Sequence, residues 1–122
     1  MLRLPPFRYL VPRSLDEAAQ MLVQEGDQAM LVAGGTDLYP NMKRRQFNPR
    51  VLIGLRSIVA LKNISGSPKQ GFRLGAGVTL TTLAEHPAMF EHYPALATAA
   101  GSVSTPQLRN MGTIGGNLLL DT

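Results

Sequence analysis

The stretch Ala33-Gly34-Gly35-Thr36-Asp37-Leu38 follows a short apolar run, and Thr113-Ile114-Gly115-Gly116-Asn117 repeats its paired glycines further along the chain. Paired glycines allow the backbone to turn with positive φ and leave no Cβ in the way of a ligand. Successive N–H groups in such a turn can form a concave nest that attracts an anion, typically a phosphate. One such loop is a weak signal. Two in one small chain predict a pyrophosphate held from both sides, as in a dinucleotide.

The first loop does not match the common phosphate-binding patterns. Residues 34–39 read Gly-Gly-Thr-Asp-Leu-Tyr, which is not G-x-G-x-x-G, and no Gly-Lys-Ser/Thr follows. A Rossmann fold and a P-loop are therefore disfavoured. The alternative of two purely structural turns stays open. If a ligand is bound, Thr36, Thr113 and Asn117 carry side-chain groups that can hydrogen-bond phosphate or ribose.

The residues around the first loop predict a small α/β unit. Residues 29–33 and 51–55 are apolar runs typical of buried strands. The proline-rich residues 1–13 predict an extended strand at a sheet edge. A strand, helix, strand, loop and strand in this order favour parallel pairing.

Two helices are expected in this unit. Ser14 and Glu17 form a capping box, in which the Glu17 side chain reaches back to Ser14. The helix ends near Gly26, and its predicted buried face consists of Leu15, Ala18, Ala19, Leu22 and Val23. A second, short helix or turn is expected over residues 38–46, and Asp37 is expected to cap it.

Beyond residue 58 the pattern changes. Strands over 61–66 and 72–76 flank a turn and predict a hairpin. Thr79 is a plausible N-cap for a helix over 80–85. Residues 87–101 contain a second helical stretch, with Leu96, Ala97, Ala99 and Ala100 on its packing face, and residues 102–112 are expected to be a loop. We therefore divide the chain into an N-terminal α/β subdomain, residues 1–58, and the first part of an α+β subdomain, residues 59–122.

Composition limits the function. Only 16% of the 122 residues are charged, which suits either a subunit with a partner interface or a fold that lines a ligand. The net charge of +4 favours an anionic ligand. The basic cluster Lys43-Arg44-Arg45 is too small, and too poor in aromatic neighbours, to predict nucleic-acid binding. Arg109 could offset ligand charge or pair with a carboxylate, and both roles stay open.

No catalytic or metal-binding residue is predicted. The chain has no cysteine, which excludes disulfides, thiolate metal sites and a cysteine nucleophile. His86 and His92 are expected at the solvated surface without partners at metal-ligand spacing. Ser102, Ser104 and Thr105 lack a nearby base. Any redox chemistry therefore needs a cofactor. No signal peptide or membrane-spanning run is visible, which predicts a cytoplasmic protein without membrane insertion.

The sequence resembles the FAD-binding medium subunit of the molybdenum hydroxylases, the family of xanthine dehydrogenase, carbon monoxide dehydrogenase and 4-hydroxybenzoyl-CoA reductase. The likeness covers essentially the whole chain. The stretches that carry it are Leu4-Pro5-Pro6-Phe7-Arg8-Tyr9, Pro12-Arg13-Ser14-Leu15-Asp16-Glu17-Ala18, Ala33-Gly34-Gly35-Thr36-Asp37-Leu38, Leu74-Gly75-Ala76-Gly77-Val78-Thr79-Leu80 and Arg109-Asn110-Met111-Gly112-Thr113-Ile114-Gly115-Gly116-Asn117. Within the family, residues 36–42 and 117–122 look most like the β subunit of 4-hydroxybenzoyl-CoA reductase.

The resemblance implies an α+β FAD-binding domain of the vanillyl-alcohol-oxidase (PCMH) type. The residues that match the family's FAD contacts are Val32, Ala33, Gly34, Gly35, Thr36, Asp37, Leu38, Val103, Thr113, Ile114, Gly115, Gly116 and Asn117. The flavin would relay electrons between iron–sulfur clusters of a 2Fe–2S small subunit and an external carrier such as NAD or ferredoxin. Substrate chemistry would occur on a molybdenum cofactor in a large subunit, within a hetero-oligomer.

Family members run to more than twice this length, so the resemblance implies that the chain is truncated. Two alternatives follow. In the first, the chain is a cofactor-free remnant that acts only as an assembly or interaction module. In the second, it is an unrelated α/β protein that binds a simple anion.

Overall fold

The computed structural model describes residues 2–120. The chain divides into two compact units, an N-terminal unit of Met1–Val59 and a C-terminal unit of Ala60–Thr122. The sequence predicted a change between residues 58 and 59.

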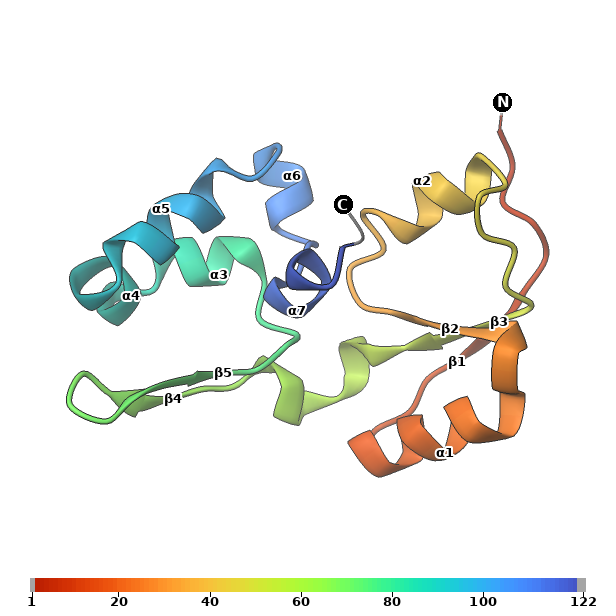
Figure 1. Ribbon diagram of the computed structural model, residues 1–122, viewed down its shortest axis with the longest axis horizontal. Helices are drawn as coiled ribbons and strands as arrows, with labels where there is room; N and C mark the ends of the chain where they lie inside the picture. Colours follow the sequence, from red (N-terminus) through yellow and green to blue (C-terminus); the bar gives the residue numbers. More distant parts are fainter. Residues whose placement is uncertain (1, 121–122) are drawn as a thin grey trace. The chain divides into compact units, whose positions relative to one another are not determined.

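The N-terminal unit is built on a three-stranded parallel sheet. Its elements are β1 Arg8–Leu10, α1 Leu15–Glu25, the 3-10 turn η1 Gly26–Gln28, β2 Ala29–Val32, α2 Leu38–Lys43, β3 Val51–Gly54 and the 3-10 turn η2 Leu55–Ser57. The strand order is β1-β3-β2, with both outer strands parallel to β3. All four residues of β3 are buried, because α1 and α2 lie on opposite faces of the sheet (Figure 1). The predicted parallel pairing and the edge strand are confirmed.

The core on the α2 face comes from apolar residues of both strands and the helix. Val32, Leu38, Met42 and Leu52 form one buried cluster. Tyr39 packs against this cluster from its rim.

The predicted buried face of α1 is wrong. Of its five residues only Ala18 is buried, whereas Leu15 and Val23 are 53% and 83% exposed. The sheet has only three short strands, so it covers a narrow stripe of the helix, which Ala18 and the half-buried Met21 fill. The spacing of apolar residues in the sequence shows which side of a helix is apolar. It does not show which part of that side packs against a sheet as narrow as this one.

Only one of the two hydrogen bonds of the predicted capping box is present at the start of α1. The Ser14 hydroxyl accepts a hydrogen bond from the Glu17 N–H at 3.1 Å. The Glu17 carboxylate, however, accepts from the Arg13 N–H at 2.7 Å rather than from Ser14. At the other end, α1 stops before Gly26, whose φ is +60°, and Glu25 pairs with Arg8 of β1.

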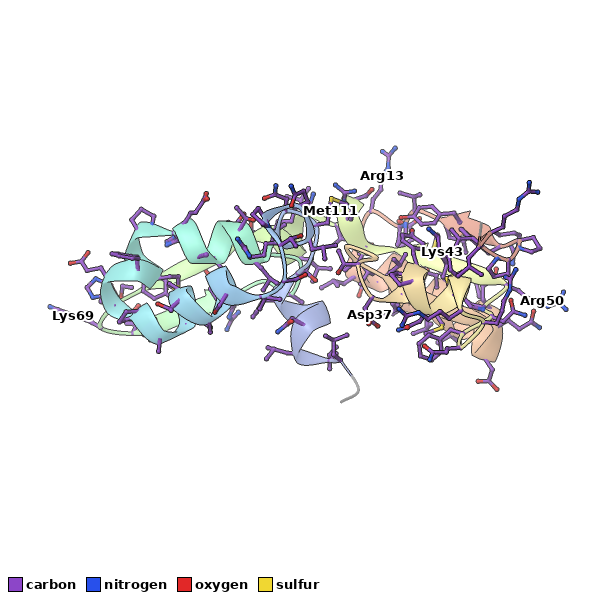
Figure 2. All side chains as sticks on the ribbon, turned by 90° about the horizontal axis from the view of Figure 1, so that it is seen from above. Arg13, Asp37, Lys43, Arg50, Lys69 and Met111 are labelled. Carbon is purple, nitrogen blue, oxygen red and sulfur yellow. The ribbon has the colours of Figure 1, made fainter. Side chains whose placement is uncertain are left out.

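The basic side chains after α2 lie at the surface. Lys43, Arg44 and Arg45 are all exposed. Arg13 and Arg50 also extend outward from the ribbon (Figure 2). The cluster is therefore a solvated turn in this unit.

The C-terminal unit combines a hairpin with a set of short helices. Its elements, beginning with a 3-10 turn at the change between units, are η3 Val59–Lys62, β4 Ile64–Ser67, β5 Gly71–Leu74, α3 Leu80–Glu85, α4 Pro87–His92, α5 Pro94–Ser102, α6 Pro106–Arg109 and α7 Ile114–Leu118. β4 and β5 pair antiparallel, which confirms the hairpin. Thr79 caps α3 by accepting from the Thr82 N–H, as predicted.

The helical stretch expected within residues 87–101 is confirmed as two helices, and the loop expected over residues 102–112 is wrong in part. The helical stretch from Pro87 is broken at Tyr93 and restarts at Pro94, because proline has no N–H to continue the first helix. Residues 102–112 are not all loop. Thr105 is an N-cap and Pro106 opens α6, a combination that favours a helix start.

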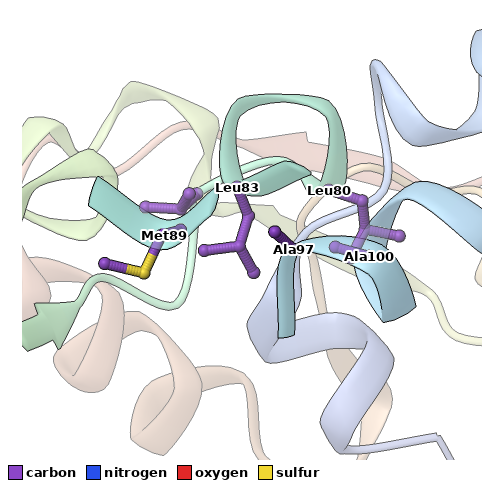
Figure 3. Close-up of a cluster of buried hydrophobic side chains, with 6 residues drawn as sticks. Leu80, Leu83, Met89, Ala97 and Ala100 are labelled. Atoms are coloured by element: carbon purple, nitrogen blue, oxygen red, sulfur yellow. The ribbon is translucent and has the colours of Figure 1, made fainter. Parts of the chain in front are cut away.

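The core of this unit lies between α3, α4 and α5. Leu83 and Met89 are almost completely buried and pack with Ala97 and Ala100 of α5 (Figure 3). The small side chains let α5 approach α3 closely. Ala99, which was predicted on this face, is exposed.

Candidate functional site

The first glycine loop, residues 33–38, joins the carboxyl end of β2 to α2. Ligands of open parallel sheets bind outside the carboxyl ends of the strands. Gly35 has φ +74°, the left-handed conformation that favours glycine. No described residue accepts a hydrogen bond from the N–H groups of Gly34, Gly35, Thr36 or Asp37. The loop therefore offers successive backbone donors, as an anion nest requires.

Tyr39 covers one side of this loop. A Cβ added to Gly35 would lie 2.2 Å from Cε2 and 2.5 Å from Cδ2 of the Tyr39 ring. The Tyr39 N–H also donates to the Gly35 carbonyl at 3.2 Å. Burial raises the pKa of Tyr39, the nearby Tyr9 raises it further, and Arg56 opposes both. Tyr39 was not among the predicted site residues, although it stands four residues after Gly35 in the first turn of a helix.

Asp37 does not cap α2 with its side chain. It occupies the N-cap position, but its backbone is helical, with φ −105° and ψ −48°, and its side chain makes no capping bond. A capping side chain normally requires an extended N-cap backbone. The Asp37 carboxylate instead accepts from the Asn41 side-chain amide at 3.0 Å.

The second glycine loop, residues 113–117, is a helix start rather than a nest. Thr113 is the N-cap of α7, and its hydroxyl oxygen accepts from the Gly116 N–H at 3.2 Å. Neither Gly115 nor Gly116 is among the described glycines with positive φ. The predicted turn geometry is therefore present at Gly35 and absent here.

The N–H groups of this second loop already have acceptors within the C-terminal unit. Ile114 donates to the Val78 carbonyl at 2.8 Å, and Gly115 donates to the Ala76 carbonyl at 2.9 Å. The Asn117 N–H bonds the Thr113 carbonyl at 2.9 Å. The bonds from Ile114 and Gly115 tie α7 to the segment before α3, whereas the bond from Asn117 lies within α7 and its N-cap. The expected backbone donation to a pyrophosphate is thus available from the first loop but not from residues 114–117 in this arrangement.

Close packing explains why residue 115 is a glycine. A Cβ at Gly115 would lie 2.6 Å from the Ala76 Cβ and 2.7 Å from the Ala76 carbonyl oxygen. At Gly116 the nearest atom would be the Thr113 hydroxyl at 3.1 Å. The two adjacent glycines therefore differ, because one faces a neighbouring backbone and the other is exposed. No local sequence signal identifies Ala76 as this neighbour.

Side chains of the two loops retain some binding capacity. Thr113 is 7% exposed, and its oxygen serves as the cap. Among the described residues, none hydrogen-bonds the Thr36 hydroxyl or the Asn117 carboxamide. These two half-buried groups are the side chains with unused donors and acceptors.

Val103 and Arg109 form a small structural contact. The Val103 side chain packs against the core cluster of the C-terminal unit. Arg109 donates to the carbonyls of Val103 and Ser104 at 3.0 and 3.2 Å. Among the described residues no carboxylate pairs with Arg109. Its guanidinium stabilises the turn before α6, and a role in offsetting ligand charge stays a prediction.

The histidines do not form a reactive centre. His86 is half-buried, and its Nδ1 atom is buried without a hydrogen-bond partner among the described residues. The centroid of its ring lies 6.5 Å from that of Phe72. The predicted solvated position is therefore wrong for His86. His92 is exposed and lies 3.7 Å from Glu91. Residues 2–120 contain no group of three or more His, Cys, Asp or Glu able to hold a metal ion. Within the same residues, no helix has the length and apolar character needed to cross a membrane.

Comparison with protein families decides the assignment. Residues 5–122 match the family described as FAD binding domain in molybdopterin dehydrogenase. The chain belongs to this family. One relative of this chain is the nicotine 6-hydroxylase medium subunit of Paenarthrobacter nicotinovorans, which is 35% identical over 96% of this chain and 41% of the relative. The carbon monoxide dehydrogenase medium chain of Hydrogenophaga pseudoflava is 39% identical over 93% of this chain and 39% of the relative.

Solved structures agree with the family. Carbon monoxide dehydrogenase from Hydrogenophaga pseudoflava superposes with a TM-score of 0.90 at 38% identity, covering 95% of this chain and 40% of that chain. Quinoline 2-oxidoreductase from Pseudomonas putida 86 gives a TM-score of 0.89 at 34% identity, with the same coverage. The chain spans about two fifths of the length of these relatives.

The family confirms the expected PCMH-type fold, the flavoprotein class and FAD as the cofactor of the domain. The residues present fit FAD unequally. The first loop has a left-handed glycine and a run of N–H groups that find no acceptor within residues 2–120, which suits a pyrophosphate. The second loop contributes a packed helix start with the Asn117 carboxamide as its unused polar group.

Proposed function

We propose that this chain is the N-terminal part of the FAD-binding medium subunit of a molybdenum hydroxylase. In the assembled enzyme it serves electron transfer between iron–sulfur clusters of a 2Fe–2S small subunit and an external carrier. The substrate reacts on a molybdenum cofactor in a large subunit. The observation that carries the proposal is the run of N–H groups from Gly34 to Asp37 that lack acceptors among the described residues.

The chain's own residues bind and orient the cofactor. Backbone N–H groups of Gly34, Gly35 and Thr36 would donate to pyrophosphate oxygens, and the Thr36 hydroxyl adds a side-chain donor. The Asn117 carboxamide would bind ribose or phosphate, and Ala33 and Ile114 would add apolar contacts. Val32, Leu38 and Val103 would support the loops from the cores of their units. Asp37, already bonded to Asn41, suits a ribose hydroxyl rather than a phosphate. When bound, FAD supplies the redox chemistry.

The substrate branch is part of the same proposal. Residues 36–42 and 117–122 resemble the 4-hydroxybenzoyl-CoA reductase β subunit, and residues 121–122 of that stretch lie outside the described part of the chain. This resemblance supports an aromatic acyl-CoA as the substrate of the assembled enzyme. The cytoplasmic location and the hetero-oligomer expected from the sequence also belong to the proposal.

The test is flavin retention. The purified chain is incubated with FAD or FMN, desalted and examined by visible absorption. We expect retention of FAD and not FMN, because the first loop recognises the pyrophosphate that FMN lacks. Gly35→Ala should abolish retention. Gly26→Ala is the matched control, since Gly26 also has positive φ but has nothing within 4 Å of an added Cβ.

The result also separates the alternative function. A folded chain that stays colourless with FAD, yet assembles with the large and small subunits, would contradict FAD binding by this chain and favour the cofactor-free assembly module. Retention by Gly35→Ala at the level of Gly26→Ala would contradict the role of the first loop.

A further inference from the structure

The ring of Tyr39 lies where the first glycine loop has no side chain of its own. The position of an added Gly35 Cβ is 2.2, 2.5 and 3.2 Å from Cε2, Cδ2 and Cζ of that ring. The ring therefore rests against the Cα of the residue with φ +74°. The Tyr39 side chain also packs against the core cluster of Val32, Leu38, Met42 and Leu52. A flat aromatic group thus connects the loop to the core.

At its helix end the first loop is held by Leu38, which packs in the core cluster, and by the hydrogen bond between Asp37 and Asn41. Its N–H groups from Gly34 to Asp37 make no hydrogen bond to described residues, and the Gly35 carbonyl is held by the Tyr39 N–H. A loop whose donors are left available for a ligand cannot use them to fix its own conformation. Packing must supply the order that hydrogen bonds do not, and the Tyr39 ring is the group that makes this contact.

We propose that Tyr39 is a positioning residue for the FAD pyrophosphate, because its ring holds Gly35 in the turn that directs the N–H groups of the first loop toward the ligand. This inference rests on the proposed FAD-binding function. A loop ordered before binding loses less conformational freedom when the ligand arrives, and this strengthens binding. The hydroxyl is not needed for this role, since the contact involves ring carbons.

The experiment compares three variants of the chain. Tyr39→Phe keeps the ring, and Tyr39→Leu removes it while keeping an apolar side chain for the core. Tyr93→Leu is the matched control, because Tyr93 makes an edge-to-face contact with Phe72 at 5.9 Å within the C-terminal unit. FAD affinity is measured by quenching of flavin fluorescence. NMR spectra of the ligand-free proteins give the Gly35 Hα shifts, which the Tyr39 ring current displaces, and the amide shifts of residues 34–37.

We expect Tyr39→Leu to weaken FAD binding by about tenfold, while Tyr39→Phe and Tyr93→Leu bind as the unmodified chain does. In the ligand-free protein, only Tyr39→Leu should lose the Gly35 ring-current shift and move the loop amides. The proposal is overturned if Tyr39→Leu binds FAD normally, or if Tyr93→Leu weakens binding equally. If the unmodified chain binds no FAD, the proposed function fails. The positioning role is then decided by the loop amides, which support it if they move in Tyr39→Leu alone and overturn it if they do not.

Discussion

The paired glycines of the second loop are expected to respond in opposite ways to a single methyl group. Gly115→Ala would place a Cβ 2.6 Å from the Ala76 Cβ and 2.7 Å from the Ala76 carbonyl oxygen. The second atom belongs to the backbone and accepts the Gly115 N–H at 2.9 Å. The segment carrying Ala76 must therefore move away from α7, and this movement stretches the hydrogen bond.

The magnitude follows from three terms. Overpacking a close contact costs about 1–3 kcal/mol, and weakening a hydrogen bond costs up to about 1 kcal/mol more. Replacing glycine by alanine within a helix returns about 0.5–1 kcal/mol. Because the clash is with a backbone atom, which yields less easily than a flexible side chain, the overpacking term lies in the upper half of its range, at about 2–3 kcal/mol. Gly115→Ala should thus lower the free energy of unfolding by about 1–3.5 kcal/mol. Gly116→Ala keeps the helix gain and meets only the Thr113 hydroxyl at 3.1 Å, so it should be neutral or slightly stabilising.

Urea unfolding followed by far-UV circular dichroism measures both variants under one set of conditions. A domain of this size shifts its melting temperature by about 4–8 °C per kcal/mol, so thermal scans give an independent check. Equal losses in the two variants would refute the packing argument, because a general intolerance of side chains in α7 would then explain both. Unchanged stability of Gly115→Ala would refute it as well.

Two further predictions follow from the structure, one for each unit. Because burial and the nearby Tyr9 raise the pKa of Tyr39 above its ordinary value of 10.0, the folded chain keeps the phenol proton where the unfolded chain has lost it. The resulting stabilisation is complete below pH 10.0 and is lost as the pH rises through the folded pKa. Above this pH the urea midpoint of the unmodified chain should therefore fall relative to that of Tyr39→Phe, and a constant difference between the two midpoints would contradict this expectation. In the C-terminal unit, Leu83 has 0% exposure, so Leu83→Ala should cost about 2–5 kcal/mol. Val23→Ala, at an 83% exposed position of α1, should change stability by less than about 0.5 kcal/mol in the same urea assay.

Local sequence rules predicted the elements that depend on nearby residues. The apolar run that forms β3 is buried on both faces, and Thr79 caps α3 with its own side chain. Such features need only a few neighbouring residues. The face of α1 was predicted wrongly because it depends on the width of a sheet assembled from three separate strands. The helix at Pro106 was missed although Thr105 and Pro106 are a recognisable start.

The two glycine loops show where sequence patterns stop being informative about a site. A pair of glycines indicates that there is no room for side chains at these positions, but it does not indicate which atoms occupy the space. At Gly35 the conformation is left-handed and the neighbouring N–H groups have no acceptor among the described residues. At Gly115 the excluded space is occupied by Ala76, and the N–H already binds its carbonyl. At both glycines the space of a Cβ is taken by the chain itself, by the Tyr39 ring at Gly35 and by Ala76 at Gly115, so only the fold shows which loop keeps its N–H groups available. Loss of FAD in a Gly115 variant would therefore report a displaced α7, whereas loss in a Gly35 variant would report a first loop moved out of its turn by the clash with the Tyr39 ring.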